Sequence, residues 1–299
     1  MTPGGGLPFT VDGRLPDLHE PVLLVNLTGW IDASAAASTA MDTVAKVTGA
    51  TTLITFDADT FIDYRARRPV MELREGVNTR IVWGTPEIRV GRDARGKDLL
   101  ILTGPEPDAA WRFFARTVGD LATEMGVSKM VGLGAYPFAA PHTRPVGITA
   151  TTPNRDVSAR LPFVRNSLDA PAGVAAVLEH EMHSRGIEAM VFWAQVPHYV
   201  ATMPYPAGSA ALIEAVCAEA GLALDTGDLP KEASAQRERL DQLVRSNPEH
   251  VEMLSKMEAA YDAIRTQTAI DIASDLPSAE QLAAEVEQFL REQGPGGTQ

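Results

Sequence analysis

The chain has 299 residues, 45% of them hydrophobic, and a formal net charge of −13. This length and composition fit one large globular domain with an appendage, or two domains. The acidic balance argues against a nucleic-acid partner and against docking on an anionic membrane, because both interactions need a basic face. No uncharged apolar stretch reaches the roughly 18 residues that a membrane helix needs.

Cys217 is the single cysteine, so a disulfide framework within the chain is excluded and a cysteine-based zinc site is not expected. The N-terminal residues lack the positive region and apolar core of a signal peptide. One thiol in a long chain fits a reducing compartment, and we therefore expect a cytoplasmic protein.

Strand and helix patterns alternate along residues 20–228. The apolar run 22–27 predicts a buried strand, which leads through Gly29-Trp30-Ile31 into an alanine-rich helix over 32–47 with Asp32 as its N-cap. The later predicted elements are a strand at 51–56, β-rich segments at 79–83, 87–91 and 97–103, a helix at 108–125, strands at 129–133 and 147–151, a helix at 173–185, a strand at 189–196 and a helix at 207–220.

This alternation predicts an α/β fold, a three-layer sandwich with a mixed, mostly parallel sheet. The turn signal Asp93-Ala94-Arg95-Gly96 predicts an antiparallel hairpin between its flanking strands. Residues 60–76 are less regular. The three arginines within residues 64–68 of this acidic chain suit an acidic partner, a carboxylate or a subunit contact. We expect most of the scattered tryptophans and tyrosines to be core residues, with Trp30 half exposed.

After residue 228 the composition changes to an all-helical appendage. Apolar residues recur at helical spacing, and Pro248 and Pro277 separate roughly three predicted helices. The expected organisation is a flexible N-terminal tail (1–19), an α/β sandwich domain (20–228), a helical C-terminal region (229–293) and a flexible tail (294–299).

Eight short motifs together resemble the proteasome assembly chaperone 2 (PAC2) family, in its bacterial and archaeal branch. In chain order they are Gly29-Trp30-Ile31-Asp32-Ala33, Asp57-Ala58-Asp59, Arg68-Pro69, Trp83, Gly104-Pro105-Glu106-Pro107-Asp108 leading to Trp111, Gly132-Leu133-Gly134-Ala135, His142-Thr143-Arg144-Pro145 and Val196-Pro197-His198-Tyr199.

The resemblance implies a phosphorylase/hydrolase-like α/β sandwich that is usually oligomeric and often has a C-terminal helical extension. It implies an assembly chaperone, with proteasome subunits as partners of its eukaryotic relatives. Proteasome-binding relatives commonly end in a hydrophobic residue, a tyrosine and one further residue. This sequence ends Gly297-Thr298-Gln299, which argues against binding by tail insertion and leaves other contact surfaces open.

Polar residues and glycines follow the predicted strands at the points where ligands bind in α/β sheets. The resulting candidate ligand pocket consists of Trp30, Asp32, Asp57, Asp59, Glu106, Gly132, Gly134, His142, Arg144 and His198. The alternative, which we favour, assigns Asp32 to helix capping, the glycines to turns, and His142 with Arg144 to structural ion pairs.

Complete catalytic motifs are missing from the sequence. Gly132-Leu133-Gly134 is half of a dinucleotide fingerprint, and neither a phosphate-binding P-loop nor a Gly-x-Ser-x-Gly elbow occurs. His180 and His183 are three apart rather than four, so a zinc site is not expected. We therefore expect no bound metal and no cofactor, and the sequence identifies no catalytic residue. The first functional hypothesis is a non-catalytic, homo-oligomeric assembly protein; the alternative is a small-molecule-binding protein or hydrolase-like enzyme.

Overall fold

The computed structural model describes residues 7–163 and 167–271. Its elements in chain order are β1 (Phe9–Val11), β2 (Val22–Thr28), η1 (Ala33–Ala35), α1 (Ala36–Val47), β3 (Thr51–Phe56), α2 (Ala58–Phe61), β4 (Val70–Arg74), β5 (Val77–Val82), β6 (Glu87–Arg92), β7 (Asp98–Pro105), α3 (Trp111–Glu124), β8 (Lys129–Phe138), β9 (Ile148–Thr151), α4 (Arg155–Arg160), α5 (Val174–Ser184), β10 (Glu188–Pro197), η2 (His198–Val200), α6 (Pro206–Ala220), α7 (Leu229–Arg245) and α8 (Pro248–Asp271).

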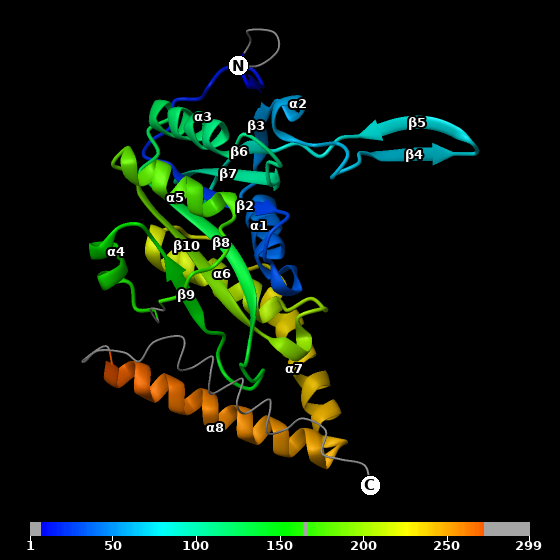
Figure 1. Ribbon diagram of the computed structural model, residues 1–299, viewed down its shortest axis with the longest axis vertical. Helices are drawn as coiled ribbons and strands as arrows, with labels where there is room; N and C mark the ends of the chain where they lie inside the picture. Colours follow the sequence, from blue (N-terminus) through cyan, green and yellow to red (C-terminus); the bar gives the residue numbers. More distant parts are fainter. Residues whose placement is uncertain (1–6, 164–166, 272–299) are drawn as a thin grey trace.

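Eight strands form the central sheet in the order β1-β3-β6-β7-β2-β8-β10-β9 (Figure 1). The four strands β7, β2, β8 and β10 are parallel neighbours, whereas the pairs at both ends of the sheet are antiparallel. The expected mixed sheet is therefore confirmed, and β6 and β7 form the hairpin that residues 93–96 predict. β1 lies within the range expected to be a tail and adds an edge strand beside β3.

Helices cover both faces of the sheet and complete a three-layer sandwich. One buried cluster joins the small-residue faces of α1 and α6 to the strands, and it includes Ala36, Ala40 and Leu212. The other cluster packs α3 and α5 on the opposite face around Phe114 and Leu178. Because the parallel strands are covered on both faces, their sequences read as continuous apolar runs rather than as alternating ones.

Strand β8 is longer than its apolar run predicts. It continues past Gly134 and Pro137 to Phe138, and it pairs with β10 along its whole length. Pairing with β2 ends at Gly132, so Pro137 lies where that side of β8 carries no ladder, which is a position that tolerates proline.

A two-stranded hairpin, β4–β5, projects from the sandwich on its own (Figure 1). The sequence predicts an irregular segment at 60–76, so the strand β4 differs from that expectation. Val70 pairs with Val82 and Met71 with Ile81, and apolar side chains on both faces of the ribbon are exposed to solvent. Trp83, which follows β5 at the base of the hairpin, was expected in the core but is 49% exposed. Trp30 is 42% exposed.

The C-terminal region contains α7 and α8, which contact each other, and α7 also packs on α6. These two helices agree with the helical pattern on either side of Pro248. The third predicted helix, after Pro277, and the C-terminal residues Gly297-Thr298-Gln299 lie outside the described residues. No helix in the described part of the chain has the length and apolar content needed to cross a membrane.

Candidate functional site

The carboxyl ends of β2, β8 and β10 meet at one edge of the sheet, because these strands are parallel neighbours. Beyond the end of β2, Asp32 forms a parallel bridge with Ala135 of β8. Trp30 and Ile31 in the intervening turn are exposed. The turn from β2 to α1 therefore lies beside β8 at the position where α/β folds place ligands.

Asp32 caps α1, although not from the position that the sequence predicts. Its carboxylate oxygens accept hydrogen bonds from the amides of Ala37 and Ser38 at 2.8 and 2.9 Å, and the Ser38 hydroxyl also donates to it. The α-helix begins only at Ala36, after Ser34 and Ala35 adopt positive φ angles of 61° and 50°. The carboxylate reaches forward across this turn to satisfy amides of the first helical turn.

Replacing Asp32 with alanine should lower the free energy of unfolding by about 2 kcal/mol, since it removes a helix cap. Urea unfolding followed by circular dichroism measures this change. Asp42→Ala is the matched control, because Asp42 lies on the same helix and is exposed. Equal losses for the two variants would contradict a specific capping role for Asp32.

Glu106, immediately after β7, supports the start of a second helix. It is 6% exposed, and its Oε1 accepts a hydrogen bond from the amide of Val174, the first residue of α5. Gly173 lies against both the Trp30 ring and Glu106, so an added Cβ there would lie 2.9 Å from Trp30 Cδ1. The structure thus brings Trp30 and Glu106 together around one helix N-terminus.

Asp57 and Asp59 are not brought to the candidate residues that follow β8 and β10. They follow β3, which is five strand positions from β10, and at a spacing of about 4.8 Å this places β3 about 24 Å from β10. The Thr60 hydroxyl donates to Asp57, whereas Asp59 accepts a hydrogen bond from Tyr64. These two carboxylates border a separate open hollow of about 600 Å³ at the base of the hairpin, near Trp83.

Gly132 and Gly134 lie inside β8 rather than in a loop. A Cβ at Gly132 would lie 2.6 Å from Val191 Cγ2, and one at Gly134 would lie 2.4 Å from the Trp193 ring. Each glycine is paired in register with the residue whose side chain it accommodates. Their absent side chains therefore make room for β10.

His142 is buried in the loop after β8 and joins that loop to η2 and α7. The Tyr199 hydroxyl lies 2.7 Å from both its backbone nitrogen and its Nδ1, and its Nε2 lies 3.2 Å from Asp241. Burial raises the pKa of Tyr199 to about 12, so the hydroxyl stays protonated. The hydroxyl can donate to Nδ1 while Nε2–H donates to the Asp241 carboxylate.

Arg144 connects the same loop to α8. Its guanidinium binds Asp262 through Nε and Nη2, at 2.9 and 2.7 Å, and Glu258 through Nη1 at 3.2 Å. His198 is exposed at the start of η2, and its ring packs edge-on against Tyr199. His142 and His198 thus both contact Tyr199, while Arg144 makes ion pairs with α8 of the C-terminal region.

The carboxylates on this edge are engaged with helix N-termini or ion pairs in the described residues, which is compatible with the structural alternative. Within those residues, no group of three His, Cys, Asp or Glu side chains is placed to hold a metal ion. The loop after β8 also borders a cavity of about 390 Å³ whose other walls include Tyr205 and Arg237. The sequence carried no signal for these two residues, because they come from segments far apart in the chain.

The fold and this edge define an α/β sandwich protein whose loop after β8 is held by two C-terminal helices. The sequence matches the PAC2 family over residues 26–244. The chain belongs to this family. None of the curated proteins compared with the chain matches it.

Solved structures from actinobacteria have the same fold. A Mycobacterium tuberculosis protein of unknown function is 30% identical, with a TM-score of 0.79 over 88% of this chain and 93% of that one. A PAC2 family protein from Streptomyces avermitilis is 31% identical, with a TM-score of 0.70 over 78% and 99%. A proteasome-assembly chaperone homologue from M. tuberculosis is 28% identical, with a TM-score of 0.72 over 78% and 99%.

Proposed function

We propose that this protein is a non-catalytic assembly protein that forms a homo-oligomer through its projecting arm, residues 65–82. The carrying observation is the exposure of apolar side chains on both faces of the β4–β5 ribbon. Val70 is 64% exposed and Met71 is 54% exposed, although successive strand residues point to opposite faces. An isolated two-stranded hairpin is at best marginally stable in water, so a partner that covers it would stabilise it.

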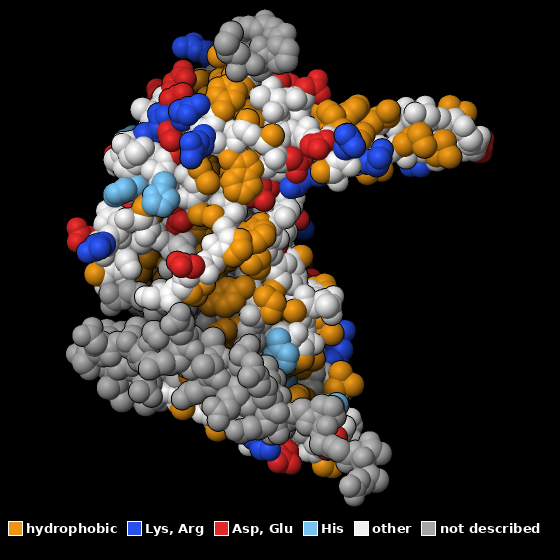
Figure 2. Space-filling model, viewed as in Figure 1, with side chains coloured by type: hydrophobic (Ala, Val, Ile, Leu, Met, Phe, Trp, Pro, Cys, Tyr) orange, Lys and Arg blue, Asp and Glu red, His pale blue; other side chains and the backbone are white. Residues whose placement is uncertain are grey.

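The charge of the arm supports a second copy of the chain as that partner. Residues 65–82 contain five arginines and two glutamates, in a chain with a net charge of −13. Figure 2 shows basic and hydrophobic side chains side by side along the projection. The body of a second copy is acidic, so it offers the opposite charge to the arginines while covering the apolar side chains.

Multi-angle light scattering after size exclusion tests the proposal. The full chain should run as an oligomer, and the double variant Met71→Asp with Ile81→Asp should run as a monomer. Leu243→Asp with Met253→Asp is the matched control, since it alters exposed apolar residues on α7 and α8 and should keep the oligomer. A monomeric wild-type chain, or an arm variant with unchanged mass, would refute assembly through the arm.

Proteasome subunits are the proposed client of the assembled protein. The support is membership of the PAC2 family and the likeness to a proteasome-assembly chaperone homologue. A pull-down from its native cytoplasm, the proposed compartment, with the tagged full chain should recover proteasome core subunits. If it recovers none while the chain is oligomeric, the client is wrong and the proposed oligomer stands.

A further inference from the structure

The cavity beside the loop after β8 lies at the junction of three parts of the chain. Loop residues 142–146, the start of α6 and one side of α7 line its volume of about 390 Å³. Much of the lining is apolar, including Val146, Ala207 and Leu240. A cavity of this size and lining, with a few polar groups, is typical of small-molecule sites.

Tyr205 lines this cavity, and its buried hydroxyl has no hydrogen-bond partner among the residues that the structure describes. The residue is 5% exposed, and its hydroxyl makes no hydrogen bond within the described residues. Burial raises the pKa of Tyr205, so the hydroxyl remains a hydrogen-bond donor. Buried polar groups normally have partners, so a ligand group or water that accepts this hydrogen bond would complete the site.

The start of α6 adds positive potential to the same cavity. Tyr205 is the N-cap residue and gives no side-chain cap, and Pro206 follows it. Ala207, in the first turn of this 15-residue helix, also lines the cavity. The N-terminus of α6 carries the positive end of the helix dipole, which favours the binding of an anion.

Arg237, on α7, lines the cavity and has no ion pair in the described part of the chain. Its Nη2 donates to the Thr143 carbonyl at 3.3 Å, and no carboxylate binds it in the described residues. The nearby carboxylates are already engaged, Asp241 with His142, and Glu258 and Asp262 with Arg144.

We propose that this cavity binds a small organic carboxylate. Arg237 pairs with the carboxylate group, the Tyr205 hydroxyl donates a hydrogen bond to it, and the apolar wall holds its hydrocarbon part. One guanidinium in a largely apolar cavity suits a single negative charge on a hydrocarbon body. Such a site would add a binding activity to the proposed assembly role without depending on it.

Calorimetric titration of the full chain with acetate, butyrate, hexanoate and benzoate, each beside its neutral amide, tests this assignment. At least one carboxylate should bind at least about tenfold more tightly than its amide. Arg237→Gln and Tyr205→Phe should each weaken that binding by about tenfold or more. Arg239→Gln is the matched control, because Arg239 lies on the same helix but outside the cavity lining, and its binding should be unchanged.

The melting temperature of Tyr205→Phe provides a separate check. Because the hydroxyl has no partner within residues 7–163 and 167–271, its removal should leave the melting temperature unchanged or raise it. A marked fall would show that the hydroxyl is satisfied internally and would refute the proposal. So would a failure of all four carboxylates to bind, equal binding of the amides, or equal effects of Arg237→Gln and Arg239→Gln. The mass of the oligomer tests the assembly role independently.

Discussion

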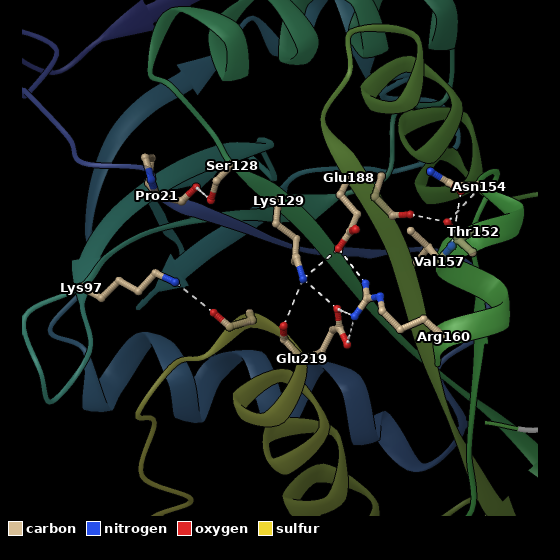
Figure 3. Close-up of polar contacts among 12 residues, drawn as sticks. Pro21, Lys97, Ser128, Lys129, Thr152, Asn154, Val157, Arg160, Glu188 and Glu219 are labelled. Carbon is tan, nitrogen blue, oxygen red and sulfur yellow. Dashed lines mark hydrogen bonds and ion pairs between the residues drawn. The ribbon is translucent and has the colours of Figure 1, made fainter. Parts of the chain in front are cut away.

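Replacing Lys129 with methionine should lower the free energy of unfolding by about 2–3 kcal/mol at neutral pH. Lys129 begins β8 at the amino edge of the sheet, opposite the candidate site. Its Nζ binds Glu219 at 2.7 Å and Glu188 at 2.8 Å (Figure 3). The variant would leave Glu219, whose side chain is 11% exposed, without one of its two cations.

The size of this loss depends on Arg160, which remains in the variant. Arg160 binds Glu219 at 2.8 Å and Glu188 at 3.0 Å, so neither carboxylate becomes unpaired. The expected loss is therefore below the roughly 3–5 kcal/mol measured when a fully buried pair loses one partner.

The pH dependence of the Lys129→Met effect follows from Glu219. Burial raises its pKa, but hydrogen bonds from Lys129 and Arg160 outweigh burial and lower the pKa below 4.5. The stability from this pairing is therefore present above pH 4.5 and is lost as the pH falls through the lowered folded pKa. Urea unfolding at pH 7 and in the acid range should show the variant's deficit shrinking as the carboxylates take up protons.

Lys46→Met is the control for this experiment, because Lys46 is exposed on α1 and has no ion pair in the described residues. It should change the free energy of unfolding by less than about 0.5 kcal/mol. A Lys129→Met deficit as small as that of Lys46→Met would show that the network contributes little.

We expect the Glu179→Gln substitution to affect the free energy of unfolding differently at pH 8 and at pH 4.5. The change should be more favourable at pH 8, by roughly 3 kcal/mol. Glu179 lies on the sheet-facing side of α5 and is 5% exposed. Burial raises its pKa to about 7, although hydrogen bonds from the Thr151 hydroxyl and the Val191 backbone act in the opposite direction.

The sign follows from proton uptake. Between pH 4.5 and 7 the folded chain holds a proton on Glu179 that the unfolded chain has released. The stability linked to this proton is fully present below pH 4.5 and is lost as the pH rises through 7. Glutamine does not titrate, so the difference between variant and wild type should grow over this range, as urea unfolding at several pH values would measure.

Glu214→Gln separates this effect from a general change of charge. Glu214 is exposed on α6 and has no ion pair in the described residues. Its substitution should shift stability equally at pH 4.5 and pH 8. A pH-independent effect of Glu179→Gln would contradict the raised pKa.

Local patterns in the sequence were sufficient to predict the central parallel sheet. The apolar run 22–27 and the small-residue helix after it correspond to β2 and α1, and Asp32 does cap that helix. The α-helix begins at Ala36 rather than at Asp32, because Ser34 and Ala35 take left-handed conformations. Non-glycine residues rarely adopt such conformations, so no sequence rule places them here.

Strand order limited the prediction of the site. Three strands, β6, β7 and β2, separate Asp57 from β8, because β3 pairs with β6 and not with any of the four parallel strands. Sequence periodicity identifies strands but not their neighbours. The same limit hid β4, whose partner β5 belongs to no larger sheet, and the cavity residues Tyr205 and Arg237, which meet only in the folded chain.

The two glycines of β8 have a consequence for folding accuracy. Because Gly132 and Gly134 have no side chains, they leave space for the side chains of Val191 and Trp193 of β10. If the register of β10 shifted by two residues toward the start of β8, Trp193 would lie opposite Gly132, but Val191 would lie opposite Met130. A slide in the other direction would place Trp193 against Tyr136. The two glycines therefore favour the observed register of β8 and β10 over a shift by two residues in either direction.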